Sequence, residues 1–129
     1  MKNLGEISTM KKRKRTNPEL LSIIRELKKR SKSEGVGLWK ALAEGLDKTK
    51  RQRVAVNLSR LNRYTVEGEV VAIPGKVLGA GEINHPLTVA AFSFSEAARA
   101  KISLSEGKSL SLRELMNSGI APSKIRIME

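Results

Sequence analysis

The chain has no cysteine, a single histidine and few aromatic residues, which make up 3 % of its length. Without cysteine there are no disulfides and no thiolate metal sites, and this usage fits a reducing compartment. The shortage of aromatic rings argues against a protein that reads single-stranded RNA by stacking its bases. No window approaches the roughly twenty apolar residues that cross a bilayer, and residues 1–10 lack the apolar stretch of a secretory signal. We therefore expect a soluble, intracellular protein with no membrane partner.

The sequence also lacks a catalytic constellation. His85 lies in a turn-like Asn84-His85-Pro86 setting, and the only aspartate, Asp47, is far from it in sequence. One histidine without cysteine offers no metal cluster, and no serine occupies a nucleophile-elbow motif. In the glycine-rich segment 74–81, Lys76 is followed by valine, where a Walker loop needs serine or threonine. We expect no catalytic residues, metal, cofactor or small-molecule substrate, and a tight turn over 74–81 that lies against protein or RNA.

What the chain has in excess is positive charge. It carries 25 Lys and Arg against 13 Asp and Glu in 129 residues, a formal net charge of +12, and its pI is about 10.4. This length suits one domain, and a domain this basic implies a polyanionic partner, most often nucleic acid. Residues 1–63 hold 18 basic and 6 acidic side chains, whereas residues 64–129 hold 7 of each. The first half is therefore expected to hold the anion, and the second to supply a neutral body.

The densest cluster of cations is Lys11-Lys12-Arg13-Lys14-Arg15. Five adjacent cations repel one another and cannot build a core, so residues 1–16 are predicted as a basic extended arm. Residues 17–129 are predicted as a single RNA-binding α/β domain. The alternative for the cluster is a merely solvated run, or one that resembles a nuclear-localisation signal.

Two helices are predicted after the arm. Asn17 can cap the first, Pro18 is tolerated at its first position, and Glu19 complements its dipole. Apolar residues then recur at helical spacing and glycines end the segment. These are Leu20, Ile23, Ile24 and Leu27, with Gly35 and Gly37 at the end. A shorter helix is predicted to carry Leu38, Trp39, Leu42 and Leu46, with Trp39 as a core anchor and not as a platform for a base.

The remainder of the chain alternates short strands with short helices. Apolar alternation predicts a half-buried strand over 54–59, and an apolar run over 70–73 is expected to stop at Pro74-Gly75. Residues 64–68 suggest a turn, and residues 87–94 and 125–127 suggest strands. Ser95 and Ser111 are expected to cap helices whose inward residues are Ala97, Ala98, Ile102, Leu112, Leu115 and Met116. The fold class is therefore α/β (α+β), with a basic arm and helices followed by an irregular β/α body.

Three ordered blocks carry a family resemblance: 56–64, 71–79, and 87–91 with Phe94-Ser95 and Ala97-Ala98. From about Asn17 to the end the chain resembles the L-eighteen-e family of large-subunit ribosomal proteins, in its archaeal form, which is related to the bacterial L-fifteen type. Relatives usually carry an Ala-Gly-Gly turn where this chain reads Leu104-Ser105-Glu106-Gly107. The resemblance implies a cytoplasmic component of the ribosome without catalysis. It also implies that the chain binds large-subunit ribosomal RNA beside neighbouring ribosomal proteins.

Charge and resemblance together predict binding by phosphate neutralisation and shape, with few base contacts, because A-form helices hide their base edges. The predicted RNA-binding residues lie in the arm, in the first helix, in the basic run before residue 54, and at the junction beyond it. They are Lys11, Lys12, Arg13, Lys14, Arg15, Arg25, Lys28, Lys29, Arg30, Lys32, Lys48, Lys50, Arg51, Arg53, Arg60, Arg63 and Lys76. Each could instead be an ordinary solvated cation. The alternative function is a small basic DNA-binding or chromatin protein, followed by an RNA-modifying enzyme.

Overall fold

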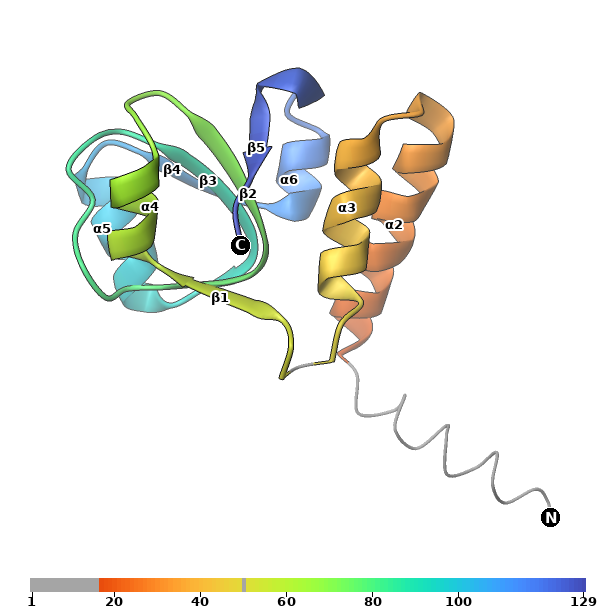
Figure 1. The fold of residues 1–129 in the computed structure, drawn as a ribbon, viewed down its shortest axis with the longest axis horizontal. Coiled ribbons are helices and arrows are strands. Elements are labelled where there is room, and N and C mark those ends of the chain that lie inside the picture. Colours follow the sequence, from red (N-terminus) through yellow and green to blue (C-terminus); the bar gives the residue numbers. More distant parts are fainter. Residues whose placement is uncertain (1–16, 50) are drawn as a thin grey trace, which may run out of the picture.

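The computed structural model describes residues 17–49 and 51–129. The predicted arm, residues 1–16, and Lys50 lie outside the described residues. Figure 1 shows a pair of helices standing beside a curved sheet, with further short helices against the sheet. The predicted mixed α/β class is confirmed.

The helix pair consists of α2 (Pro18–Glu34) and α3 (Gly37–Leu46). The Asn17 side chain accepts a hydrogen bond of 2.8 Å from the Glu19 amide and so caps α2 as predicted. At the other end Gly35 adopts φ 67°, a left-handed conformation that glycine takes without steric cost, and its N–H donates to the Ser31 carbonyl. The predicted apolar stripe of α2 is buried, as is Trp39 of α3, so both core predictions are confirmed.

The sheet contains β1 (Val54–Asn57), β2 (Val70–Leu78), β3 (Thr88–Phe94), β4 (Lys108–Ser111) and β5 (Ile125–Ile127). All the strand pairs in the described part of the chain are parallel, in the order β1-β2-β3-β4, and β5 also pairs with β2. One edge of β2 is shared, because β5 pairs with residues 70–72 and β1 pairs with residues 75–78. The basic segment before β1 is thereby joined to the middle of the sheet.

Two strand predictions are wrong in their bounds. β2 does not stop at Pro74-Gly75 but continues to Leu78, because a register shift between Ile73 and Lys76 accommodates the proline. At Gly75 a Cβ would lie 1.9 Å from the Val54 carbonyl oxygen, so glycine allows β1 to approach here. The strand predicted over 54–59 is too long, since Leu58 begins a helix, α4 (Leu58–Tyr64), that buries Leu58 and Leu61 at helical spacing.

The remaining helices are α5 (Glu96–Leu104), α6 (Leu112–Met116) and the short η1 (Pro122–Lys124). The predicted caps are confirmed, because the Ser95 hydroxyl accepts from the Ala98 amide at 3.1 Å and Ser111 forms a capping box with Glu114. Of the residues expected to face inward, Ala97 is exposed and the others are buried. Strand β4 was not predicted, since Leu110 is its only large apolar residue.

The sheet separates two hydrophobic clusters. On one face, residues of α2, α3 and α6 pack over Ala72 and Ala90; on the other, residues of α4 and α5 pack over Val71, Ile73 and Val89. Val89 is fully buried in the middle of β3. Helices therefore cover each face, and α2 occupies the outer side of the molecule in Figure 1, where one of its faces stays in solvent.

Candidate nucleic-acid interface

The solvent face of α2 carries Arg25, Lys28, Lys29 and Lys32, all of which lie outside its buried stripe. At 3.6 residues per turn, positions spaced by three, four and seven fall on one side of a helix. Lys28 lies 3.7 Å from the Asp47 carboxylate, whereas the other three cations have no ion pair with any residue that the structure describes. A row of uncompensated cations therefore faces solvent along α2.

Two acidic residues of the same helix are held away from this row by Arg113 of α6. The Arg113 guanidinium donates to the Glu26 carboxylate at 2.8 Å and to the Glu19 carboxylate at 2.6 Å. The hydrogen bond from Arg113 lowers the pKa of Glu26, with coulombic attraction acting in the same direction and desolvation opposing it. In return, the hydrogen bonds with Glu26 and Glu19 raise the pKa of Arg113. Arg113 thus compensates one of these two negative charges within the protein and binds both carboxylates at α6.

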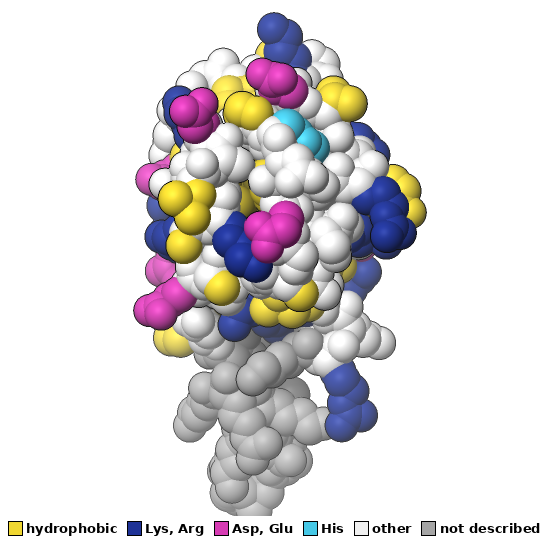
Figure 2. Space-filling view, turned by 90° about the vertical axis from the view of Figure 1, so that its left-hand side faces the viewer, with side chains coloured by type: hydrophobic (Ala, Val, Ile, Leu, Met, Phe, Trp, Pro, Cys, Tyr) yellow, Lys and Arg dark blue, Asp and Glu magenta, His cyan; other side chains and the backbone are white. Residues whose placement is uncertain are grey.

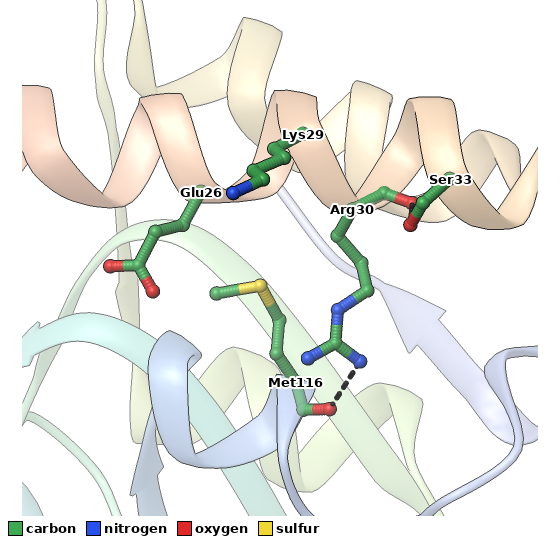
Figure 3. Close-up of a pocket in the computed structure, with 5 residues that line it drawn as sticks. All are labelled: Glu26, Lys29, Arg30, Ser33 and Met116. Carbon is green, nitrogen blue, oxygen red and sulfur yellow. Dashed lines mark hydrogen bonds between the residues drawn. The ribbon is translucent and has the colours of Figure 1, made fainter.

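Arg30 was predicted to contact RNA, and the structure places its side chain against the end of α6. Its guanidinium donates to the Met116 carbonyl at 2.9 Å, to the Asn117 side chain at 3.1 Å and to Glu34 at 3.2 Å. Figure 3 shows Arg30 reaching from α2 to the Met116 carbonyl of α6, across a pocket that Glu26, Lys29 and Ser33 also line. Arg30 thus binds one backbone carbonyl and one side-chain oxygen at the end of α6, where cations are commonly found.

The basic run after α3 forms a loop at the lower end of the molecule in Figure 1. The Lys48 ammonium lies 3.8 Å from the Glu129 carboxylate, and Arg53 donates weakly to the Lys48 carbonyl at 3.4 Å. Arg51 is exposed, and Lys50 lies outside the described residues. The two side chains with partners hold the loop and the chain end together, and Arg51 projects from the loop toward solvent.

Lys76 lies close to this loop. In the sheet register Lys76 is opposite Ala55, two residues beyond Arg53. Its neighbour Val77 is buried in the cluster with α4 and α5, so the exposed Lys76 side chain points to the sheet face that α3 covers. The fold therefore brings Lys76 together with the 48–53 loop, a neighbourhood that the sequence separation of more than twenty residues did not reveal.

Arg60 and Arg63 form a second group on α4, across the sheet from α2. Both are exposed, and the Arg60 guanidinium carbon lies 5.3 Å from the centre of the Tyr64 ring. This is a cation–π distance, and it orients Arg60 along the helix surface. The predicted cations in the described residues thus lie in two regions. One runs from α2 to the segment before β1 and Lys76, and the other is on α4.

Several cations of the second half serve the fold. Lys101 donates to the carbonyls of Gly79 and Gly81 at 3.0 and 2.9 Å, and it lies 3.5 Å from the Glu82 carboxylate. Arg126 donates to the Tyr64 carbonyl at 2.7 Å and pairs with Glu69 at 3.3 Å. Figure 2 shows the face with α4 and α5, on which acidic and basic side chains are interspersed. The described residues of this face form no continuous field of one sign.

The glycine-rich turn and His85 pack within the protein. Gly81 adopts φ 92°, and a Cβ there would lie 2.7 Å from the Ser59 amide nitrogen, so the turn is pressed against α4. The His85 Nε2 lies 2.8 Å from the Thr65 hydroxyl, which in turn lies 2.6 Å from the Leu61 carbonyl. Where the hydroxyl donates to that carbonyl, it accepts a hydrogen bond from Nε2–H. The prediction of a tight turn over 74–81 is therefore wrong for residues 74–78, which continue β2. Only residues 79–81 leave the strand, and they lie against the protein's own α4 and α5.

Within residues 17–49 and 51–129, no three histidine or acidic side chains gather as metal ligands would. None of the described helices is long and apolar enough to span a membrane.

Comparisons with known proteins agree on one family. A family model described as ribosomal proteins 50S-L15, 50S-L18e and 60S-L27A matches residues 3–110. The large ribosomal subunit protein eL18 of Methanothermobacter thermautotrophicus is 44 % identical over 89 % of this chain and 95 % of its own length. The eL18 of Methanococcus maripaludis is 45 % identical over 92 % of this chain and 99 % of its own length. The eL18 of Methanosphaerula palustris is 40 % identical over 89 % of this chain and 95 % of its own length. The predicted resemblance is confirmed, and the chain belongs to the family of ribosomal proteins 50S-L15, 50S-L18e and 60S-L27A.

Proposed function

We propose that this protein is a structural constituent of the large ribosomal subunit, located with the ribosome in the cytoplasm, where it binds ribosomal RNA. The relatives that match over nearly their whole length are named as large-subunit proteins of methanogens, which supports the archaeal type. Membership of a family of ribosomal structural proteins implies a role in assembly and architecture, and not in catalysis. RNA and neighbouring ribosomal proteins are the partners that follow from this role.

The observation that carries the RNA-binding surface is the separation of charge on α2. Arg25, Lys29 and Lys32 face solvent without ion pairs among the described residues, while Arg113 holds Glu19 and Glu26 of the same helix. A cation that is already neutralised gains little by meeting a phosphate, whereas an uncompensated one releases counterions from the RNA. The row along α2 therefore forms the centre of the proposed interface.

The other predicted cations extend this interface, and their proposed RNA contacts have unequal support. Lys28, Lys48, Arg51, Arg53 and Lys76 continue the charge from α2 toward the sheet, although Lys28 and Lys48 each have a carboxylate partner. Arg60 and Arg63 supply a second contact region on α4. Arg30 is committed to α6, so its predicted RNA contact has the least support. The arm cations Lys11, Lys12, Arg13, Lys14 and Arg15, and Lys50, lie outside the described residues and stay predictions from sequence.

Binding to a fragment of large-subunit ribosomal RNA, measured at several salt concentrations, tests the proposal. With on the order of six phosphates neutralised, log K should fall by roughly four to five units per tenfold rise in salt. The triple variant Arg25→Gln, Lys29→Gln, Lys32→Gln should weaken binding. It should also reduce this slope by roughly one unit for each phosphate that the variant no longer neutralises.

The matched control neutralises three exposed cations of the second half, Arg99→Gln, Lys108→Gln and Lys124→Gln, which changes net charge equally. If both triple variants weaken binding to the same extent, net charge alone drives binding and the α2 surface is wrong. Binding to a duplex DNA of the same length tests the alternative function, because a DNA-binding protein should bind this DNA more tightly than the RNA.

A further inference from the structure

The turns that precede three strands form a continuous edge of the sheet. Parallel strands begin on the same side, and β2, β3 and β4 follow the turns 65–69, 85–87 and 104–107. The Gly68 amide donates to the Pro86 carbonyl at 3.0 Å, and the Lys108 amide donates to the Leu87 carbonyl at 2.9 Å. The three turns therefore lie side by side, with the 85–87 turn in the middle.

This edge exposes apolar side chains that the core does not use. Leu104 is 83 % exposed and Val66 is 67 % exposed, more than any other large hydrophobic residue in the described part of the chain. Val66 lies in one outer turn and Leu104 is the last residue of α5, where the other outer turn begins, on either side of half-buried His85 and Pro86. In Figure 2 the single histidine, in cyan, has hydrophobic and acidic side chains near it. Several apolar groups brought together at a surface mark an interaction site more strongly than scattered ones do.

Each outer turn also carries an acidic residue. Glu67 and Glu106 are exposed, and neither has an ion pair with another described residue. Glu106 adopts φ 67°, and it is the one residue other than glycine with positive φ in the described ranges. A side chain kept in a conformation that glycine would adopt without strain suggests a local use for it. We name Val66, Glu67, His85, Pro86, Leu104 and Glu106 the edge patch.

We propose that the edge patch docks an apolar, basic segment of a neighbouring ribosomal protein. Two uncompensated carboxylates would repel RNA phosphates, whereas they complement Lys or Arg side chains of a protein partner. Among the exposed cations near this edge, Arg126 is paired with Glu69, while Lys108 begins β4 and Lys124 precedes β5. These cations do not outnumber the acidic residues here, so the edge lacks the excess of positive charge that RNA binding requires. The edge lies at the opposite end of the molecule from the basic 48–53 loop in Figure 1, which leaves both surfaces free to bind at once. This inference rests on the proposed function, because it takes its partner from the same subunit.

Site-specific crosslinking tests the proposal directly, because the chain has no cysteine of its own. Val66→Cys, Leu104→Cys and Lys32→Cys each receive a thiol-linked photocrosslinker, and each protein is added to large subunits that lack this protein. Ala100→Cys on the exposed side of α5 is the matched control. The proposal expects Val66→Cys and Leu104→Cys to crosslink to protein, and Lys32→Cys to crosslink to RNA.

A binding comparison supplies the second arm. The variant Val66→Ser, Glu67→Gln, Leu104→Ser, Glu106→Gln should bind naked ribosomal RNA as the wild type does and bind the depleted subunits roughly tenfold more weakly. Its control, Glu96→Gln with Ala100→Ser, should match the wild type on both. RNA adducts from the edge positions, no adducts there, or equal binding to depleted subunits would overturn the docking proposal while leaving RNA binding intact. If Lys32→Cys yields no RNA adduct and the wild type binds neither substrate, the proposed function fails as well.

Discussion

The helix region, residues 17–63, and the body, residues 64–129, use their cations in different ways. In the helix region Arg25, Lys29 and Lys32 face solvent without an ion pair among the described residues. In the body Lys101, Arg113 and Arg126 bind carboxylates or carbonyls that join one element to another. We therefore propose that the RNA-binding surface lies where uncompensated cations gather on one face, as they do along α2, and not where single exposed cations are scattered, as in the body. Substitutions in each region can test this difference.

The largest expected effect tests whether the body is a core and not a second binding surface. Val89→Asp places a carboxylate in a fully buried position of β3, and an unpaired charge there should cost several kcal/mol of a typical domain's roughly 5–15 kcal/mol. Thermal melting followed by circular dichroism measures the loss. Ser103→Asp, at an exposed position of α5, is the control and should melt within a few degrees of wild type. An unchanged melting temperature for Val89→Asp would contradict the assignment of β3 to the core.

The next effect concerns binding. Residues 1–16 hold five adjacent cations and no apolar periodicity, so their deletion should leave the melting temperature nearly unchanged and weaken RNA binding. The salt slope should shrink by roughly one unit for each phosphate that the arm had neutralised. Replacing Lys11 to Arg15 with neutral residues should reproduce most of the loss at constant length. Unfolding of the truncated protein would show that residues 1–16 belong to the core, and unchanged affinity and slope would show that they do not bind RNA.

The sequence predicted what depends on neighbours along the chain. Asn17, Ser95 and Ser111 act on amides two or three residues away, and helical spacing revealed the buried stripe of α2. The partners of Arg30 and Arg113 could not be predicted, because each contacts groups more than eighty residues away. An arginine with such a distant partner has the same local sequence pattern as a solvated one. The α2 row was predicted as a cluster, but the division into free and committed cations required the fold.

Substitution of Arg113 should have a smaller effect on stability, and this effect should depend on pH. In Arg113→Met the carboxylates of Glu19 and Glu26 lose their partner, so α2 should be held less strongly against α6 at neutral pH. Arg113 lowers the pKa of Glu26 in the folded state below its ordinary value of 4.5. The stabilisation is therefore fully present above that pH and is lost as the pH falls through the lowered folded-state pKa.

Thermal melts of wild type and Arg113→Met between neutral pH and pH about 3 measure this linkage. The difference between the two proteins should be largest at neutral pH and should shrink in acid. Lys124→Met removes an exposed cation that has no ion pair among the described residues, and it should show no such trend. A difference that stays constant with pH would mean that Arg113 stabilises by packing and not through its carboxylate partners.

The smallest expected effect is a gain in stability, and it comes from a substitution in the body. Glu106 holds φ 67° in the turn between α5 and β4, a conformation that costs a residue with a Cβ roughly 1–2 kcal/mol and costs glycine little. Glycine also loses more entropy on folding, so Glu106→Gly should stabilise the protein by only about 0.5–1 kcal/mol. Glu106→Asn should recover part of this gain, because asparagine tolerates the left-handed region. Glu106→Gln keeps the strain and removes the charge, and it should melt as the wild type does.

These variants separate strain from charge in the edge patch. If Glu106→Gly is more stable than wild type and binds depleted large subunits more weakly, the acid is kept at the expense of stability for an interaction that the isolated protein does not make. If Glu106→Gly and Glu106→Gln bind those subunits as the wild type does, the charge of Glu106 has no part in docking. A Glu106→Gly protein that melts below wild type would show that the turn is not strained, which would remove one independent support for the edge patch.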